Sequence, residues 1–280
     1  MTRQSKCLEG ADMAYKVGFV GVGNMGGALL ERMKEADSII KFVAYDKNKE
    51  HLYQLAKKLN FGTEVSARAL TKSADIIILA VKPQNCREVL QEMKEVFDDS
   101  KILVTIVAGL PISFYKNILG SKAKVVRTMP NTPALVGEGM TLVSFDNLVN
   151  DAEKEFIVKL FRHAGKVEEL NEKLMCEVTA LTGSSPAYVF MFIEAMADAA
   201  VQSGIPRHLA YKLAAQAVLG SAKMVLETGK HPAELKDMVC SPAGTTIEAV
   251  AALEREGFRN AVITAMKECT RRAREIAKNE

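Results

Sequence analysis

The chain has 280 residues, 48% of them apolar, and a formal net charge of +3. Its length suits one large or two medium domains with a substantial core, while the weak charge, the absence of tryptophan and an aromatic content of 6% argue against nucleic acid as a partner. The five cysteines are widely spaced and include no CxxC pair, which predicts reduced thiols in a cytoplasmic protein. The four histidines lack metal-ligand spacing, so we expect no metal. No stretch is apolar for long enough to span a bilayer, so we expect no membrane association.

The first 14 residues are polar and fit no helix or strand pattern. We predict that residues 1–14 are a disordered extension, and Met13, just before the first apolar run, is a candidate natural start.

The stretch from Lys16 to Gly26 predicts a dinucleotide site. An apolar β-type run leads into Gly21-x-Gly23-x-x-Gly26, and an apolar-periodic helix follows. In such a turn the first glycine permits the tight bend, the second lets the backbone approach a pyrophosphate, and the third brings helix and strand close. The N–H groups at the helix start would face the phosphates. The alternative is a merely structural strand–helix turn.

A second β-type run, Ile39–Tyr45, ends at Asp46. An acidic residue at this place commonly accepts the adenosine ribose hydroxyls, which favours NADH. The alternatives are an ordinary turn aspartate and, through Lys47 and Lys49, a site for the 2′-phosphate of NADPH. The sequence therefore leans only weakly towards NADH.

Alternating strands and helices continue to about residue 173. The expected strands are 75–81, 102–107, 124–128, 141–145 and 165–169, and the expected helices are 50–60, 85–97 and 151–163. Alternation of this kind predicts an α/β Rossmann-type domain over residues 15–173, with a doubly wound, mostly parallel sheet. Ligands of such sheets bind at the carboxyl edge, where Lys82-Pro83 and Ala108-Gly109 follow two strands.

From about Leu174 the β-type runs stop, and proline and glycine punctuate a series of helices. We expect helices at 186–203, 206–228, 232–239, 244–256 and 258–278. Several are alanine-rich and apolar around most of their circumference, so they need more covering than 105 residues can supply. We therefore predict an all-α dimerisation domain over residues 174–280. The alternative is a compact monomeric bundle.

The loop Cys240–Thr246 brings small residues and hydroxyls to the start of a helix. Either Thr245 or Thr246 caps that helix, or the loop binds an anion with its exposed N–H groups and presents a hydroxyl to a reacting atom. The segment Leu181–Pro186 is a second hydroxyl-rich helix start.

Five motifs together resemble one family, the Δ1-pyrroline-5-carboxylate reductases. The motifs are Val20–Gly26, Ala80–Pro83, Met129–Pro133, Thr182–Tyr188 and Ser241–Thr246, and the likeness spans the chain from Lys16 to its end. The resemblance implies reduction of 1-pyrroline-5-carboxylate to L-proline with NADPH or NADH. It also implies homodimers with interleaved C-terminal helices, often five in a ring. A protonated imine accepts hydride readily, so such a site needs positioning and an anion clamp more than a nucleophile.

The resemblance also implies site residues. The cofactor residues would be Gly21, Val22, Gly23, Asn24, Met25, Asp46, Ala80, Val81, Lys82, Pro83, Ile106, Val107 and Ala108. The substrate residues would be Glu172, Ser241, Gly244, Thr245 and Thr246. Thr246 would be catalytic, through a hydrogen bond from its hydroxyl to the ring nitrogen.

Three positions depart from the family pattern, and two other functions stay open. Ala243 and Ser185 stand where the family has glycine, and Ala67 stands where some members have asparagine. A β-hydroxyacid or imine reductase of similar architecture would need a catalytic lysine, for which Lys212 and Lys223 are the candidates. A non-catalytic nucleotide-binding protein is the other alternative.

Overall fold

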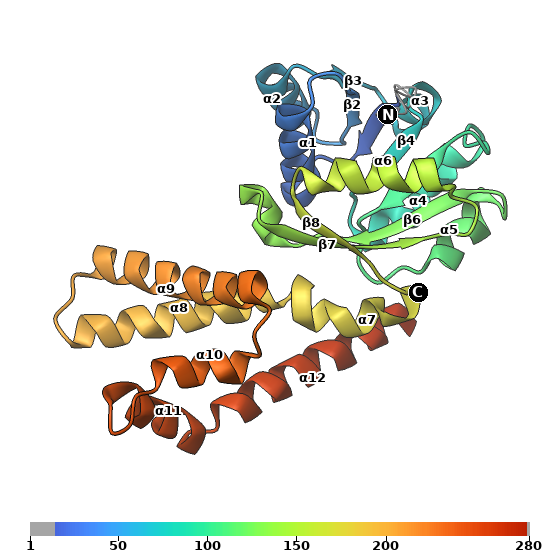
Figure 1. The fold of residues 1–280 in the computed structure, drawn as a ribbon. Coiled ribbons are helices and arrows are strands. Elements are labelled where there is room, and N and C mark those ends of the chain that lie inside the picture. The colour runs from blue at the N-terminus through green and yellow to red at the C-terminus, as the bar shows by residue number, and fades with distance from the viewer. Residues whose placement is uncertain (1–14, 279–280) are drawn as a thin grey trace, which may run out of the picture. The chain divides into compact units, whose positions relative to one another are not determined.

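The computed structural model describes residues 15–278 and forms two compact units (Figure 1). One unit runs through Met175 and takes in the C-terminal residues from Ile276, and the other spans Cys176–Glu275. The disordered extension predicted for residues 1–14 lies outside the described residues.

The first unit alternates strands and helices, as the sequence predicts. Its strands are β1 (Lys16–Val20), β2 (Lys41–Tyr45), β3 (Gly62–Thr63), β4 (Ile76–Leu79), β5 (Ile102–Thr105), β6 (Lys124–Met129), β7 (Gly139–Phe145) and β8 (Gly165–Glu169). Its helices are α1 (Asn24–Ala36), α2 (Lys49–Leu59), α3 (Ala67–Ser73), α4 (Pro83–Lys94), α5 (Ile112–Leu119) and α6 (Asp151–Arg162), with short 3-10 turns η1 (Thr132–Val136) and η2 (Glu172–Leu174). The sequence did not predict β3, α3 or α5.

Within the described residues, eight strands form one sheet in the order β3-β2-β1-β4-β5-β6-β7-β8. The pairs from β3 to β6 are parallel, β7 is antiparallel to β6, and β8 is parallel to β7. The strand order reverses between β1 and β4, and both strands end at the same edge. In open α/β sheets a crevice for ligands forms at such a point.

Helices cover both faces of this sheet (Figure 1). On one face Val17 and Phe19 of β1 pack in a core with residues of α1 and α6, such as Leu29 and Phe161. On the other face Val20 packs in a second core with residues of α3, α4 and α5. Every residue of β4 is fully buried, which confirms the expectation that this apolar run has both faces covered.

The second unit consists of helices. They are α7 (Met175–Val178), a π-helical turn η3 (Thr179–Gly183), α8 (Ser185–Gln202), α9 (Arg207–Thr228), α10 (Pro232–Val239), α11 (Thr245–Arg255) and α12 (Phe258–Lys278). The long helices α8 and α9 pack along each other, and Ala197, Ala210 and Ala214 are buried. Small side chains here let two backbones approach closely.

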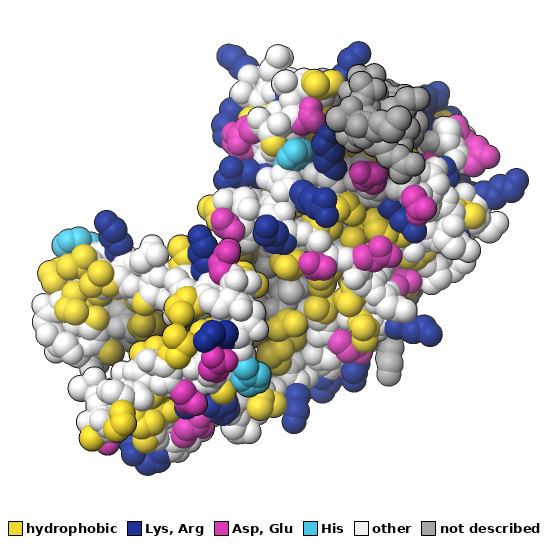
Figure 2. Space-filling model, in the orientation of Figure 1, with side chains coloured by type: hydrophobic (Ala, Val, Ile, Leu, Met, Phe, Trp, Pro, Cys, Tyr) yellow, Lys and Arg dark blue, Asp and Glu magenta, His cyan; other side chains and the backbone are white. Residues whose placement is uncertain are grey.

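Large apolar side chains of α8 and α9 remain exposed in the single chain. They include Val189, Phe190, Met191, Phe192, Leu209, Tyr211, Leu213, Leu219, Met224 and Leu226. Figure 2 shows apolar side chains gathered over these helices. Exposed apolar surface on this scale is the mark of an interaction surface rather than of a solvated face. None of the helices between residues 15 and 278 combines the length and apolarity needed to cross a bilayer.

Candidate active site

The turn after β1 depends on two glycines for its shape. Gly21 adopts a φ of +98°, and its N–H donates to the Tyr45 carbonyl at 2.8 Å. A Cβ on Gly21 would lie 2.7 Å from the Ala80 carbonyl oxygen, and one on Gly26 would lie 2.4 Å from the Gly21 carbonyl oxygen. Glycine at these two positions therefore lets β1, β4 and the start of α1 come together.

Gly23 differs, because neither its conformation nor its packing requires glycine. Its φ is −67°, which any residue adopts, and an added Cβ would meet no atom within 4 Å. The open space beside it belongs to a cavity of about 330 Å³ that Gly23 lines. Glycine here keeps that space free for a group approaching the backbone, as a dinucleotide pyrophosphate does. The local structure thus fits a nicotinamide dinucleotide.

The cavity brings together many of the predicted cofactor residues from the ends of β1, β2 and β4. Its lining consists of Val20, Gly21, Gly23, Tyr45, Asp46, Lys47, Ala80, Val81, Lys82, Asn85, Glu88, Val89 and Glu92. Val22, Asn24, Met25, Pro83, Ile106, Val107 and Ala108 are outside this lining. The sequence reasoning missed the contribution of α4, although Asn85, Glu88 and Glu92 are spaced for one helix face.

Asp46 lines the cavity and also hydrogen-bonds backbone N–H groups of two turns. One of its carboxylate oxygens accepts from the Val22 N–H and the other from the Asn48 N–H, each at 2.8 Å. Burial raises the pKa of Tyr45, and the carboxylates of Glu92, Asp46 and Glu88 raise it further. Negative charge therefore gathers near Tyr45, and the lining of the cavity also includes the two lysines Lys47 and Lys82.

A buried polar network fixes the strand end at Ile106–Ala108. The hydroxyls of Thr105 and Tyr115 hydrogen-bond at 2.8 Å, and the Thr105 hydroxyl also accepts from the Val107 N–H at 3.2 Å. Burial is the main cause that raises the pKa of Tyr115, so this hydroxyl keeps its proton. The chain therefore leaves the carboxyl edge at β5 in a defined direction.

Glu172 is the one predicted substrate residue that belongs to the first unit. Its carboxylate accepts from the Ile112 N–H at 2.6 Å and pairs with the buried Arg127 at 3.2 Å. Glu172 also lines a cavity of about 430 Å³ with residues of β7 and β8. The partnership with Arg127 was not apparent from the sequence, because 45 residues separate the two.

The other predicted substrate residues surround the start of α11 in the second unit. Gly244 is the N-cap of this helix and no side chain caps it, so the interpretation of Thr245 or Thr246 as the cap is wrong. The two threonines are instead the first two helical residues, where backbone N–H groups lack partners within the helix. Ala243 has a φ of +57°, the left-handed region that suits glycine, which the family has at this position.

The second hydroxyl-rich segment forms the π-helical turn η3 and the start of α8. The Ser185 hydroxyl donates to the Leu181 carbonyl at 2.5 Å, and the Ser184 hydroxyl accepts from the Cys269 thiol at 3.2 Å. Ser185, where the family has glycine, therefore bonds within its own turn. Ala67, the third departure, is the first residue of α3 and is fully buried in the second core.

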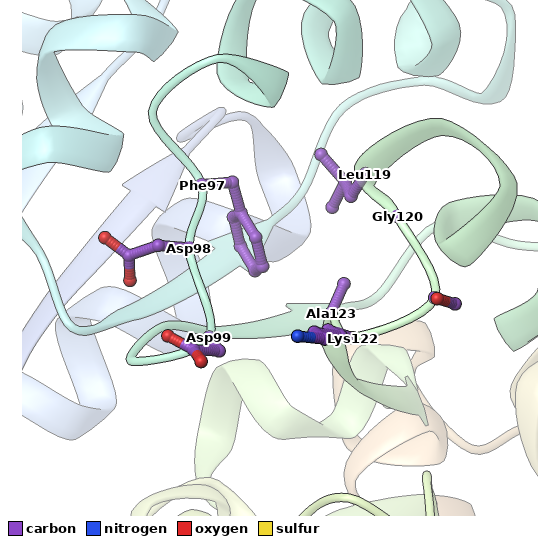
Figure 3. Close-up of a pocket in the computed structure, with 8 residues that line it drawn as sticks. Phe97, Asp98, Asp99, Leu119, Gly120, Lys122 and Ala123 are labelled. Atoms are coloured by element: carbon purple, nitrogen blue, oxygen red, sulfur yellow. The ribbon is translucent and has the colours of Figure 1, made fainter.

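A separate cavity of about 430 Å³ lies where the chain enters β5 and β6, at the amino edge of the sheet. Figure 3 shows Phe97, Leu119 and Ala123 turned towards one another, with the Asp98 carboxylate pointing away. That carboxylate accepts a hydrogen bond from the Ser100 N–H at 3.0 Å. The pKa of Asp98 is lowered, and the largest cause is the hydrogen bond from the Ser100 hydroxyl. The Asp98 carboxylate thus stabilises a turn instead of facing the cavity. The cavity also lies at the amino edge of the sheet, whereas such sheets bind ligands at the carboxyl edge.

Known proteins resemble the chain over nearly all its length. The family model described as NADP oxidoreductase, coenzyme F420-dependent, matches residues 16–109, and the one described as pyrroline-5-carboxylate reductase dimerisation matches residues 172–276. The pyrroline-5-carboxylate reductase of Escherichia coli is 46% identical over 269 residues, covering 95% of this chain and 100% of that protein. The one from Methanosarcina acetivorans is 40% identical, covering 94% and 98%. The structure of Plasmodium falciparum pyrroline carboxylate reductase with NADP bound is 34% identical, covers 94% and 98%, and superposes with a TM-score of 0.85.

The two kinds of glycine in the turn predict opposite effects of an added methyl group. Gly23→Ala fills open cavity space, so nucleotide affinity should fall while the nucleotide-free protein keeps its stability within about 0.5 kcal/mol. Gly26→Ala forces a close contact with the Gly21 carbonyl, which should cost about 1–2 kcal/mol net of the helix propensity gained. Denaturant unfolding without nucleotide, paired with calorimetric titration of NADPH, measures both. Equal loss of stability in the two variants would contradict this account.

Proposed function

The chain belongs to the pyrroline-5-carboxylate reductase family, and we infer that it reduces 1-pyrroline-5-carboxylate to L-proline with NADPH or NADH, the last step of proline biosynthesis. The observation that carries this is the identity of 46% to the Escherichia coli enzyme over its full length. The cavity at the β1–β4 reversal, with Gly23 open to it, agrees with this activity from the chain's own geometry. We propose that the two domains predicted from the sequence have separate functions: residues 15–173 bind the cofactor, and residues 174–280 bind substrate and dimerise.

For the cofactor, we propose that the turn from Gly21 to Met25 holds the pyrophosphate and that Asp46 accepts from the adenosine ribose. Ala80–Pro83 and Ile106–Ala108 would border the nicotinamide end, since they follow β4 and β5 at the same sheet edge. The bound nicotinamide supplies the hydride. The protein's part is to hold its ligands in line and to exclude water.

For the substrate, we propose that the start of α11 clamps the carboxylate. The N–H groups at Thr245 and Thr246 are unpartnered within the helix and carry the positive end of its dipole, which suits an anion. The Thr246 hydroxyl would hydrogen-bond the ring nitrogen, and Ser241 and Gly244 would shape the loop. We also propose Glu172, held by Arg127, as a substrate residue. A protonated imine with a fixed carboxylate is then ready to accept hydride.

The two alternative functions lack matching features. Lys212 and Lys223, the candidates for a β-hydroxyacid-type lysine, are exposed on α9 and line none of the cavities described above. A non-catalytic nucleotide-binding protein would not need the Ser241–Thr246 motif. Steady-state turnover, followed by the absorbance of the reduced nicotinamide with pyrroline carboxylate, separates the three. Robust oxidation of NADPH or NADH supports the reductase, and no turnover with a folded, nucleotide-binding protein would overturn it.

For the assembly, we propose a homodimer built through the second unit, with dimers joining in rings of five as the family resemblance implies. The exposed apolar side chains of α8 and α9 support the dimer, since burying them is worth about 25 cal/mol per Å².

For the location, we propose the cytoplasm. Among the described residues, none of the four cysteines Cys86, Cys176, Cys240 and Cys269 is joined in a disulfide, which suits a reducing compartment.

The dimer proposal predicts that a glutamate introduced at two exposed apolar positions has different effects on the assembly. Met191 of α8 is 69% exposed and Ile39, before β2, is 80% exposed in the single chain. Met191→Glu should dissociate or destabilise the assembly because the charge enters a covered surface, whereas Ile39→Glu should change nothing. Light scattering after gel filtration should give the wild type at least twice the 30.6 kDa of one chain. A wild-type monomer at micromolar concentration would contradict the proposal.

The acidic end of the cavity predicts that NADH is used at least as well as NADPH. Asp46, Glu88 and Glu92 would repel a 2′-phosphate, and a unit charge at contact distance is worth about 1 kcal/mol or more. Asp46→Ser should therefore shift the ratio of kcat/KM towards NADPH by about fivefold or more. Asp46→Asn, which keeps an oxygen for the Val22 N–H, isolates the charge. A wild type that strongly prefers NADPH would instead assign the phosphate to Lys47 or Lys49.

The hydrogen bond proposed for Thr246 predicts a specific kinetic loss. Thr246→Val removes the hydroxyl and keeps the side-chain shape, and an unmet hydrogen bond in a closed site costs roughly 1–3 kcal/mol. The kcat/KM for pyrroline carboxylate should fall roughly 10- to 100-fold, with cofactor affinity unchanged. The melting temperature should hold, because Gly244 is the cap of α11. Wild-type catalysis by this variant would remove Thr246 from the mechanism.

A further inference from the structure

Two side chains, Asp46 after β2 and His51 in the first turn of α2, hydrogen-bond the backbone of the glycine turn. Val22 is fully buried, and its N–H donates to the Asp46 carboxylate at 2.8 Å. Its carbonyl oxygen is 2.9 Å from Nε2 of His51. The preceding N–H, that of Gly21, donates to the Tyr45 carbonyl. One segment, Tyr45–His51, therefore fixes three backbone groups of the turn.

The chemistry of the partner sets the state of the His51 ring. A carbonyl oxygen can only accept a hydrogen bond, so Nε2 carries the proton and donates it. The backbone of His51 is fixed as well, because its N–H donates to the Asn48 side chain at 3.1 Å in the first turn of α2. The ring is thus anchored at its base by the helix and at its tip by Val22.

The bond to the Val22 carbonyl has a consequence on the far side of the same peptide unit. In a planar trans peptide the C=O and the following N–H point in opposite directions. The oxygen directed at His51 therefore turns the N–H of Gly23 away from His51. Gly23 lines the 330 Å³ cavity, whereas His51 and Val22 do not. His51 can thus orient a group at the cavity without lying in it.

We propose that His51 is a positioning residue for the cofactor: by holding the Val22 carbonyl, it orients the Gly23 N–H towards the pyrophosphate. This rests on the proposed function, in which the turn from Gly21 to Met25 receives a nicotinamide dinucleotide. The proposal assigns to the cofactor site a residue, His51, that belongs neither to the glycine motif nor to the cavity lining.

A different role for His51 makes a different prediction. With Lys47 and Lys49 nearby in the chain, the ring could instead contact a 2′-phosphate, which NADPH has and NADH lacks. The pyrophosphate is common to both cofactors. A residue that orients the pyrophosphate turn must affect NADH and NADPH alike, whereas a phosphate ligand must affect NADPH alone.

The test compares His51→Met with His51→Gln in the full-length enzyme. Methionine removes the donor, whereas glutamine can place an amide N–H near the position of Nε2. Calorimetric titration should show NADH and NADPH binding to His51→Met weakened by a common factor of about three to ten, with largely restored binding in His51→Gln. The KM for pyrroline carboxylate should stay unchanged.

Gln54→Met is the matched control, since Gln54 is exposed on the same helix and its side-chain amide donates to Glu50 of that helix at 3.4 Å. It should bind both cofactors as the wild type does. Unchanged binding in His51→Met, a loss confined to NADPH, or an equal loss in Gln54→Met would each overturn the proposal. Wild-type protein that binds both nucleotides but turns over no pyrroline carboxylate would refute the function and leave this binding test valid.

Discussion

The close approach of three backbone segments at the β1–β4 reversal is the constraint on which the site depends. Gly21, Gly26 and Ala80 meet there, and a Cβ on Gly26 would lie 2.8 Å from that of Ala80 and 2.4 Å from the Gly21 carbonyl oxygen. Because these three residues are small, α1 starts directly against the ends of both strands. The N-cap of that helix, Gly23, then lines the cavity between them. Buried cores on the two faces of the sheet support this edge.

The sequence predicted the parts of the site that follow from local chain geometry. A glycine turn between a strand and a helix, and loops at the ends of parallel strands, converge at one edge in any doubly wound sheet. The contributions of Glu88, Glu92 and Arg127 could not be predicted in this way, since they depend on how α4 crosses the edge and on a contact between distant segments. The strand β3 has two residues, too few for any periodicity. The cap assignment at Thr246 failed because Gly244, one residue before the pair of threonines, already begins the helix.

The second unit shows why composition alone could indicate an assembly. Ala197, Ala210 and Ala214 are buried in α8 and α9, whereas large side chains such as Phe190, Met191 and Leu226 of the same helices are exposed. These two helices therefore leave much of their large apolar surface uncovered in the single chain. Association with a second surface completes that burial, which is consistent with the dimerisation family model over residues 172–276.

Hydrogen–deuterium exchange of the enzyme with and without NADPH tests most directly whether the dinucleotide binds at the strand reversal. If it does, NADPH slows exchange in residues 20–26, 45–51 and 80–89. The cavity at residues 97–99 and 119–123, at the opposite edge of the same sheet, serves as the internal reference and should exchange unchanged. Protection confined to residues 97–99 and 119–123, with the glycine turn unaffected, would contradict the account.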